Sequence, residues 1–338
     1  MVKERRKKII FLFQFVVFIL IFVLLFMGIN QIFLSKNENY YTYVNYKKQQ
    51  ENSIDILVLG SSHSMDGIDA NDLDRLLKEN YGLTTKTFNM SVTGMRLEQV
   101  NYRYKEAIKT QCPKIVVIET FSCAPQSTGT EEDINRWALD YMPLSFEKLS
   151  YIKTDVEEEL QTSFVVPFIK YHSRWNELTG EDFEAVSMKE ILGKSQGSGL
   201  EAPDKPDFIG DPDDYFEQDF KKITDIKTLP DTYQQDMAEI IEIAESMGTK
   251  IIFLSIPYKV QADFYNTELI KCNNYLEKNY VDNKNIFILD MNKNIEELNW
   301  SYAYMTDEGH VNNKGRDVVE EEIAKFLGME LQSYLEEK

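Results

Sequence analysis

The sequence predicts an α/β protein built on a doubly wound parallel sheet. Short apolar runs rich in Val and Ile alternate along the chain with longer segments whose apolar residues recur at helical spacing. The runs contain few polar residues, which is typical of strands that are buried on both faces of a parallel sheet. The hydrophobic fraction of 43% over 338 residues is enough for a sizeable core. Five such runs therefore predict a five-stranded sheet covered by helices.

The N-terminus carries a candidate membrane anchor. Residues 9–29 contain no charge and are long enough to cross a bilayer as a helix. Residues 3–8 carry a charge of +4, which by the positive-inside rule places residues 1–8 in the cytoplasm. A cleaved signal peptide is the alternative, but the apolar run is long for one and no A-x-A-like site follows it. We expect a cytoplasmic tail (1–8), a transmembrane anchor (9–31), a juxtamembrane linker (32–50) and an extracytoplasmic domain (51–338).

The alternation of strands and helices places each element along the domain. Strands are expected over residues 54–59, 85–90, 114–119, 250–255 and 286–289, and helices over 69–81, 97–110, 231–247, 262–278 and 313–327. Asp69 is a candidate N-cap, and Gly82 and Gly248 are expected to end their helices. Residues 121–229 break the pattern and include a long loop over 193–214. We interpret 121–229 as an insertion that caps the site.

Charge and cysteine content exclude several classes of function. The formal net charge is −19, and it becomes −23 once residues 3–8 are set aside. So acidic a domain does not suit nucleic acid, which is bound through basic patches. The three cysteines suggest no disulfide framework, and no CxxC spacing indicates zinc. We expect no metal and no cofactor.

Two separated segments together carry the elements of a catalytic triad. Ser61, Ser62 and His63 follow the first strand, where ligands bind in open α/β sheets. Asp307 and His310 are three residues apart, so on one helical turn they would share a face. Serine needs a base to become a nucleophile, and a carboxylate beside that base fixes its tautomer. We expect Ser62 as nucleophile, His310 as base and Asp307 as its orienting group.

These motifs resemble those of the SGNH hydrolase superfamily of esterases and acyltransferases. The Gly60-Ser61-Ser62 turn matches the first family block, a loop with Asn89 and Gly94 matches the second, and Asp307-x-x-His310 matches the last. The resemblance covers residues 51–120 and 231–330 and implies a flavodoxin-like sheet. It implies an oxyanion hole formed by the backbone N–H groups of Ser62 and Gly94, since glycine lets a backbone approach closely.

The chain departs from the family pattern at two places. Ser61 stands where the wider family has an aspartate before its serine. No asparagine follows the third strand, where the family supplies an oxyanion donor. Thr120, Ser122 or a residue of the insertion is expected to replace that donor, and the sequence does not choose among them.

Four further residues are expected to contact substrate. Asn89 lies in the second block, and His63 follows the nucleophile directly, so its side chain is expected to point away from Ser62 in a structural or substrate-contact role. His172 and Arg174 lie in a stretch of the insertion that resembles one found in the membrane-bound branch of the family. An arginine there suits an anionic substrate group, although an ordinary packed helix is the alternative.

The resemblance and the anchor together define the expected function. The branch most similar to this chain acts with membrane-bound O-acyltransferases and includes the teichoic acid D-alanyl transfer protein and alginate acetylation proteins. It implies a serine O-acyltransferase or esterase that moves an acetyl or D-alanyl group to or from a cell-surface polymer. A membrane-bound O-acyltransferase is the expected partner. A plain carbohydrate esterase and a non-catalytic polymer-binding module remain as alternatives.

Overall fold

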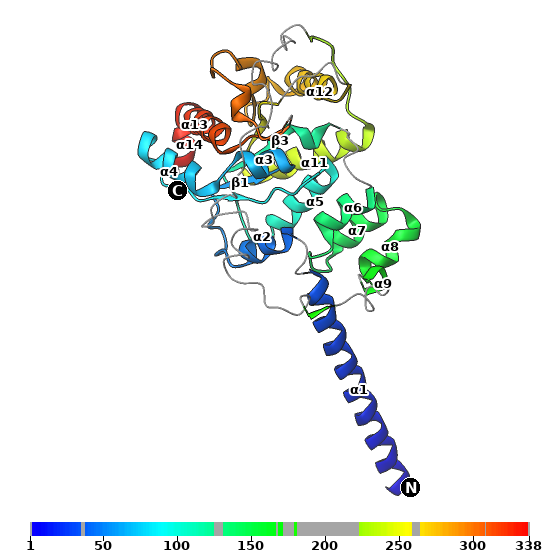
Figure 1. Cartoon of the computed structure of the whole chain (residues 1–338). Coiled ribbons are helices and arrows are strands. Elements are labelled where there is room, and N and C mark those ends of the chain that lie inside the picture. The colour runs from blue at the N-terminus through cyan, green and yellow to red at the C-terminus, as the bar shows by residue number, and fades with distance from the viewer. Residues whose placement is uncertain are drawn as a thin grey trace.

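The computed structural model describes residues 2–34, 38–124, 131–166, 168–171, 179–180, 223–258, 264–307 and 309–336. Within these ranges five parallel strands form one sheet in the order β2-β1-β3-β4-β5 (Figure 1). The strands are β1 (Ile56–Leu59), β2 (Thr87–Asn89), β3 (Ile115–Glu119), β4 (Lys250–Ser255) and β5 (Ile286–Asp290). The predicted α/β class and five-stranded parallel sheet are confirmed.

The strand order reverses direction between β1 and β3. The chain runs from β1 to β2 on one side and then returns to β3 on the other side of β1. This is the flavodoxin-like order, in which ligands bind outside the carboxyl ends of the two strands where the direction reverses. The segments that follow β1 and β3 therefore lie where this topology predicts a binding site.

Helices cover both faces of the sheet. One face is covered by α4 (Ala70–Tyr81), α13 (Asn313–Glu330) and α14 (Gln332–Glu336), and the other by α5 (Leu97–Ala107), α11 (Asp231–Met247) and α12 (Phe264–Tyr280). Along β1, Leu57 and Leu59 point into one core and Ile56 and Val58 into the other, as the period of two in a strand requires. The predicted helices and strands outside residues 121–229 are thus present.

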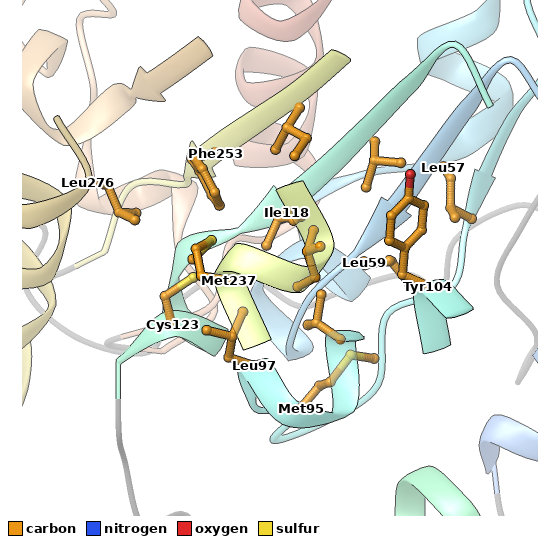
Figure 2. Close-up of a cluster of buried hydrophobic side chains, with 14 of the residues drawn as sticks. Leu57, Leu59, Met95, Leu97, Tyr104, Ile118, Cys123, Met237, Phe253 and Leu276 are labelled. Carbon is orange, nitrogen blue, oxygen red and sulfur yellow. The ribbon is translucent and has the colours of Figure 1, made fainter. Parts of the chain in front are cut away.

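The larger core joins the sheet to α5, α11 and α12. Figure 2 shows Leu57 and Leu59 of β1 with Phe253 of β4, and on the helix side Tyr104 of α5 and Met237 of α11. All five side chains are fully or almost fully buried. Truncating one such side chain to alanine typically costs about 2–5 kcal/mol of stability. This core therefore stabilises the sheet that carries the candidate site.

The helix α4 begins and ends where the sequence predicts. Asp69 caps its N-terminus by accepting hydrogen bonds from the N–H groups of Asn71 and Asp72. Gly82 ends it in the left-handed region, with φ of 72°. Glycine adopts this conformation without the steric penalty of a Cβ atom.

The first helix, α1 (Val2–Leu34), extends away from the domain (Figure 1). Residues 4–28 have the length and composition of a membrane span, and an 18-residue window within them has a mean hydropathy of 3.3. Its apolar side chains, such as Phe11 and Phe13, are exposed. Such a helix suits a single-pass anchor or a signal sequence.

Residues 38–47 differ from the expected linker. They form the helix α2 (Glu38–Lys47), which packs on the domain. Tyr46 is buried, its ring lies edge-on against Phe88 of β2, and its hydroxyl donates to the carbonyl of Ala107 at 2.8 Å. Tyr41 is also buried. Both tyrosines therefore pack on the domain.

The described part of the insertion is helical. After the short helix η1 (Thr120–Cys123) it contains α6 (Glu131–Leu139), α7 (Phe146–Asp155), α8 (Glu158–Val165) and α9 (Phe168–Tyr171). These helices form their own apolar cluster, which contacts α5 through Tyr102. They therefore pack beside α5 rather than into the sheet. The expectation that the insertion caps the site stays a prediction, and the 193–214 loop lies outside the described residues.

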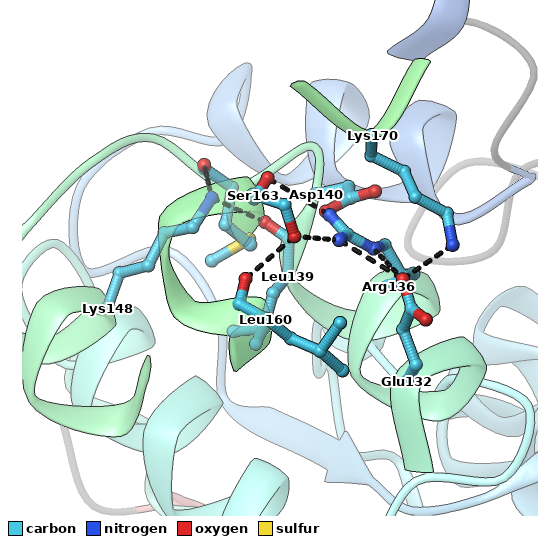
Figure 3. A network of polar contacts seen from close by, with 9 residues as sticks. Glu132, Arg136, Leu139, Asp140, Lys148, Leu160, Ser163 and Lys170 are labelled. Atoms are coloured by element: carbon cyan, nitrogen blue, oxygen red, sulfur yellow. Dashed lines mark hydrogen bonds and ion pairs between the residues drawn. The ribbon is translucent and has the colours of Figure 1, made fainter. Parts of the chain in front are cut away.

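Buried cationic side chains hold the insertion helices together (Figure 3). Arg136 of α6 donates to Asp140 at 3.0 Å and to the hydroxyl of Ser163 on α8 at 2.5 Å. Lys148 of α7 donates to the carbonyl of Leu139 at 2.7 Å. Charge-assisted hydrogen bonds of this kind are stronger than neutral ones. They fix α6, α7 and α8 relative to one another.

Glu320 of α13 should make stability depend on pH. Its carboxyl is buried and accepts a hydrogen bond from Asp69 N–H at 2.5 Å, and burial raises the pKa of Glu320 to about 9. The folded state therefore keeps a proton that the unfolded chain loses, so stability falls as pH rises from the ordinary pKa of 4.5 toward 9. Between pH 5 and 8, the free energy of unfolding should fall by less in Glu320→Gln than in the wild type, and the difference should be on the order of 3 kcal/mol. Urea unfolding of the detergent-solubilised chain measures this, and equal declines in both proteins would contradict it.

Candidate active site

The predicted nucleophile lies at the start of a short helix that follows β1. Gly60 and Ser61 form the turn, and α3 (Ser62–Gly67) begins at Ser62 with Ser61 as its N-cap. A Cβ atom on Gly60 would lie 2.4 Å from Ser64 Oγ and 2.5 Å from Glu119 Cβ. Only glycine fits at this position, because β1 and β3 end side by side there.

Three predicted side chains meet in a hydrogen-bonded series. Ser62 Oγ lies 2.7 Å from His310 Nε2, and His310 Nδ1 lies 2.9 Å from each carboxylate oxygen of Asp307. Ser62 and His310 are 248 positions apart in the chain, and the fold brings them together. A serine, a base and an orienting carboxylate in this order are the parts needed for nucleophilic catalysis.

Asp307 reaches His310 through a turn and not through the helical turn that the spacing suggested. Its Oδ1 accepts hydrogen bonds from the N–H groups of Gly309 and His310 at 2.8 and 2.9 Å, ahead of α13. Burial alone would raise the pKa of Asp307, but the hydrogen bonds from His310 and Gly309 and the charge of His310 outweigh it and hold this pKa well below its usual range. Asp307 is therefore ionised throughout the neutral range.

The loop that carries His310 is held by Asn312, a residue that the sequence reasoning missed. Asn312 is fully buried, and its Nδ2 donates to the carbonyls of Ala303 and Met305. Its Oδ1 caps α13 by accepting from Gly315 N–H at 3.1 Å. An asparagine just before a helical pattern is a capping signal that could have revealed it.

His63 is a buried residue that lies beside the triad. Its ring is 4% exposed, lies 4.1 Å from the ring of Phe121 and meets the ring of His310 edge-on at 5.0 Å. Burial, and next the charge of His310, lower the pKa of His63 to about 3, so it is neutral. The structure places His63 as a packing support for His310. Of the two roles expected for His63, its burial suits the structural one, and contact with substrate stays a prediction.

Asn89 also has a supporting position. It is fully buried at the end of β2, and its Nδ2 donates to the carbonyls of Ser64 and Ile68 at 2.8 and 2.9 Å. Its Oδ1 accepts from Ser91 N–H at 3.1 Å. These bonds hold α3 against β2. The expected contact of Asn89 with substrate stays a prediction.

The oxyanion hole stays a prediction. Val92 N–H donates to Gly60 O at 3.0 Å, which joins the loop of Gly94 to the nucleophile turn. Gly94 has φ of 67°, a conformation that favours glycine. Of the candidates for the missing third donor, Ser122 uses its hydroxyl to donate to Glu119 O at 2.6 Å. The buried hydroxyl of Thr120 has no hydrogen-bond partner among the described residues.

Two predicted substrate residues, His172 and Arg174, lie outside the described residues. Across the part of the chain that the structure describes, no group of three or more His, Cys, Asp and Glu side chains could hold a metal ion.

Glu119 is the second supporting residue that the sequence reasoning missed. It ends β3, it is 1% exposed, and its carboxyl contacts Ser61. The sequence signal that could have identified Glu119 is a charged residue at the carboxyl end of an otherwise apolar strand.

No family model matches the chain, and no curated protein matches it. Among solved structures, the chain is similar to a protein of Bacteroides fragilis described as a "putative acylhydrolase". The similarity covers 87% of this chain and 95% of that chain, at 12% sequence identity and with a TM-score of 0.38. Similarity at this level says nothing about the reaction of this chain.

Proposed function

We propose that the protein is a membrane-anchored, extracytoplasmic serine O-acyltransferase or esterase that acts on an acyl ester of a cell-surface polymer. The observation that carries this proposal is the hydrogen-bonded series Ser62–His310–Asp307 at the carboxyl end of β1. Each atom has the partner that acyl transfer through a serine requires. The resemblance of the three blocks to the SGNH superfamily supports the same reaction.

The proposed reaction has two halves. Ser62 Oγ attacks the ester carbonyl, its proton passes to His310 Nε2, and that proton then goes to the leaving alcohol as the ester C–O bond breaks. The acyl group is now bound to Ser62 as an ester. In the second half His310 takes the proton of an incoming hydroxyl, which attacks the acyl carbonyl. The bond between the acyl group and Ser62 Oγ then breaks, and His310 returns the proton to Ser62 Oγ. Asp307 keeps His310 in the tautomer that accepts at Nε2.

The acceptor of the second half decides between transfer and hydrolysis. The side chain of His310 is 29% exposed and that of Asp307 is 55% exposed. Solvent therefore reaches the base, and this favours plain ester hydrolysis as the second candidate function. A polymer hydroxyl that occupies the site, with a membrane-bound O-acyltransferase as acyl supplier, is the proposed transferase arrangement.

Turnover of a simple acetyl ester tests the proposal. The purified chain should release 4-nitrophenol from 4-nitrophenyl acetate, with a first burst equal to the amount of enzyme if deacylation is slow. Glycerol or a sugar alcohol should raise turnover and appear as the acetylated product if transfer is favoured. Release into water alone would indicate a hydrolase, and no release above a Ser62→Ala control would contradict both.

The proposed topology can be tested with a natural cysteine. Cys112 is exposed, whereas Cys123 and Cys272 are buried. If residues 1–8 are cytoplasmic, Cys112 lies outside the cell. A membrane-impermeant maleimide should then label intact cells, and Cys112→Ser should abolish the label. Labelling that needs cell lysis would contradict the extracytoplasmic placement.

A further inference from the structure

The carboxyl of Glu119 and the nucleophile turn meet at the carboxyl ends of β1 and β3. Glu119 Oε2 accepts a hydrogen bond from Ser61 Oγ–H at 2.7 Å and one from Ser61 N–H at 3.2 Å. Its Oε1 accepts from Phe121 N–H at 2.6 Å. The carboxyl therefore receives three hydrogen bonds, and two of them come from the residue directly before Ser62.

This contact leaves little freedom for the turn. Gly60, on the other side of Ser61, has no room even for a Cβ atom between Ser64 and Glu119. Ser61 Oγ also accepts from His63 N–H at 3.3 Å, which makes Ser61 the cap of α3. Ser61 is therefore held from both sides, by Glu119 and by the first turn of α3. Because Ser62 follows Ser61 directly, the position of Ser61 also fixes the backbone of Ser62.

A buried carboxyl of this kind is unfavourable for stability. Burial raises the pKa of Glu119 to about 7, although the hydrogen bonds from Ser61 and Phe121 and the nearby His310 lower it. The titratable groups that face it are His310, from the loop before α13, and Cys123 of η1. Groups that are unfavourable to bury and lie beside a reactive side chain are often kept because the reaction needs them.

We propose that Glu119 is a positioning residue, which holds Ser61 and thereby sets Ser62 Oγ at hydrogen-bond distance from His310. The proposal rests on the acyl-transfer function proposed above. It assigns to Glu119 the support of the nucleophile turn, in a chain where Ser61 replaces the aspartate of the related family. The carboxyl of Glu119 bonds to Ser61 and Phe121, so it acts on Ser62 through Ser61.

Kinetics of three variants test the proposal with 4-nitrophenyl acetate. Glu119→Gln should lower kcat by about 10²-fold and leave KM nearly unchanged, because a displacement of about 1 Å at the nucleophile has this effect. Ser61→Ala should lower kcat less. In the double variant the loss should be smaller than the product of the two single losses, because the two residues act through one contact. A loss equal to that product, or a wild-type kcat in Glu119→Gln, would overturn the proposal.

Glu119→Asp separates position from charge. Aspartate keeps the negative charge but withdraws the carboxyl from Ser61 by one methylene, so kcat should fall here as well. Full activity in this variant would overturn the positioning role. Glu320→Gln is the matched control, since Glu320 is also a buried glutamate that accepts a backbone N–H, at a place that does not touch Ser61. Its kcat should equal that of the wild type.

A spectroscopic measurement separates this proposal from the proposed function. The chain has three histidines, so the ring signals of His310 can be assigned by NMR with single His→Gln variants. In Glu119→Gln the His310 signals should move toward those of Ser62→Ala, because the 2.7 Å hydrogen bond is lost in both. His310 signals that stay at wild-type positions in Glu119→Gln would overturn the positioning role, even in a protein without esterase activity. If the wild-type protein has no esterase activity but the His310 signals of Glu119→Gln move as expected, only the proposed function is contradicted.

Discussion

Ser62→Ala and His310→Ala are each expected to lower kcat by about 10⁶-fold while leaving the fold intact. The two residues act on one proton, which moves along the 2.7 Å hydrogen bond between Ser62 Oγ and His310 Nε2. Once either is removed the other has no partner in the reaction. The double variant should therefore be no slower than either single variant. The measurement is turnover of 4-nitrophenyl acetate, with circular dichroism to show that each variant is folded.

Two outcomes would contradict this pairing. One is a double variant whose loss equals the product of the single losses, which would mean that the residues act independently. The other is a loss in Ser61→Ala as large as that in Ser62→Ala. The hydroxyl of Ser61 points to Glu119 at 2.7 Å and not to His310, so its removal should cost far less.

Asp307→Ala is expected to lower kcat by about 10⁴-fold, less than the loss of Ser62 or His310. Asp307 orients His310 through two contacts of 2.9 Å but transfers no proton itself. Its ionised carboxylate also accepts the N–H groups of Gly309 and His310, so the variant should loosen the loop that carries the base. The expected readout is a fall in kcat with little change in KM.

Asp307 should also make the stability of the fold depend on pH, with a definite sign. The pKa of Asp307 is depressed, so the stability that its ionised form contributes is present at neutral pH and is lost as pH falls below the ordinary value of 3.8. Asp307→Ala should remove this acid-dependent part of the unfolding free energy. Unfolding curves at pH 7 and pH 3 measure it. An equal difference between wild type and variant at both pH values would contradict the assigned role.

The sheet was predictable because its strands are buried on both faces. Ile56 to Leu59 and Ile115 to Ile118 are continuous apolar runs, and the helices between strands have a helical apolar period and clear end signals such as Asp69 and Gly82. That Ser62, His310 and Asp307 come together was also predictable, since a nucleophile turn and an Asp-x-x-His pair lie at opposite ends of this pattern.

The contacts that the supporting residues make were not predictable from the sequence alone. Asn89 and His63 are polar residues next to the motifs, and only the packing shows that their side chains are buried within the fold. Tyr41 and Tyr46 follow an apolar helix, where tyrosine is typical of a membrane interface, yet both pack on the domain. The contact of Glu119 with Ser61 joins two strands that are distant in sequence, so no local pattern indicates it.

Labelling with a fluorophosphonate serine probe, read by the mass of the modified peptide, tests the identity of the nucleophile most directly. The wild-type protein should carry one label on Ser62, Ser61→Ala should keep it, and Ser62→Ala should lose it. A label that survives Ser62→Ala but vanishes in Ser61→Ala would contradict the assignment of Ser62, and a wild-type protein that takes no label would contradict serine catalysis altogether.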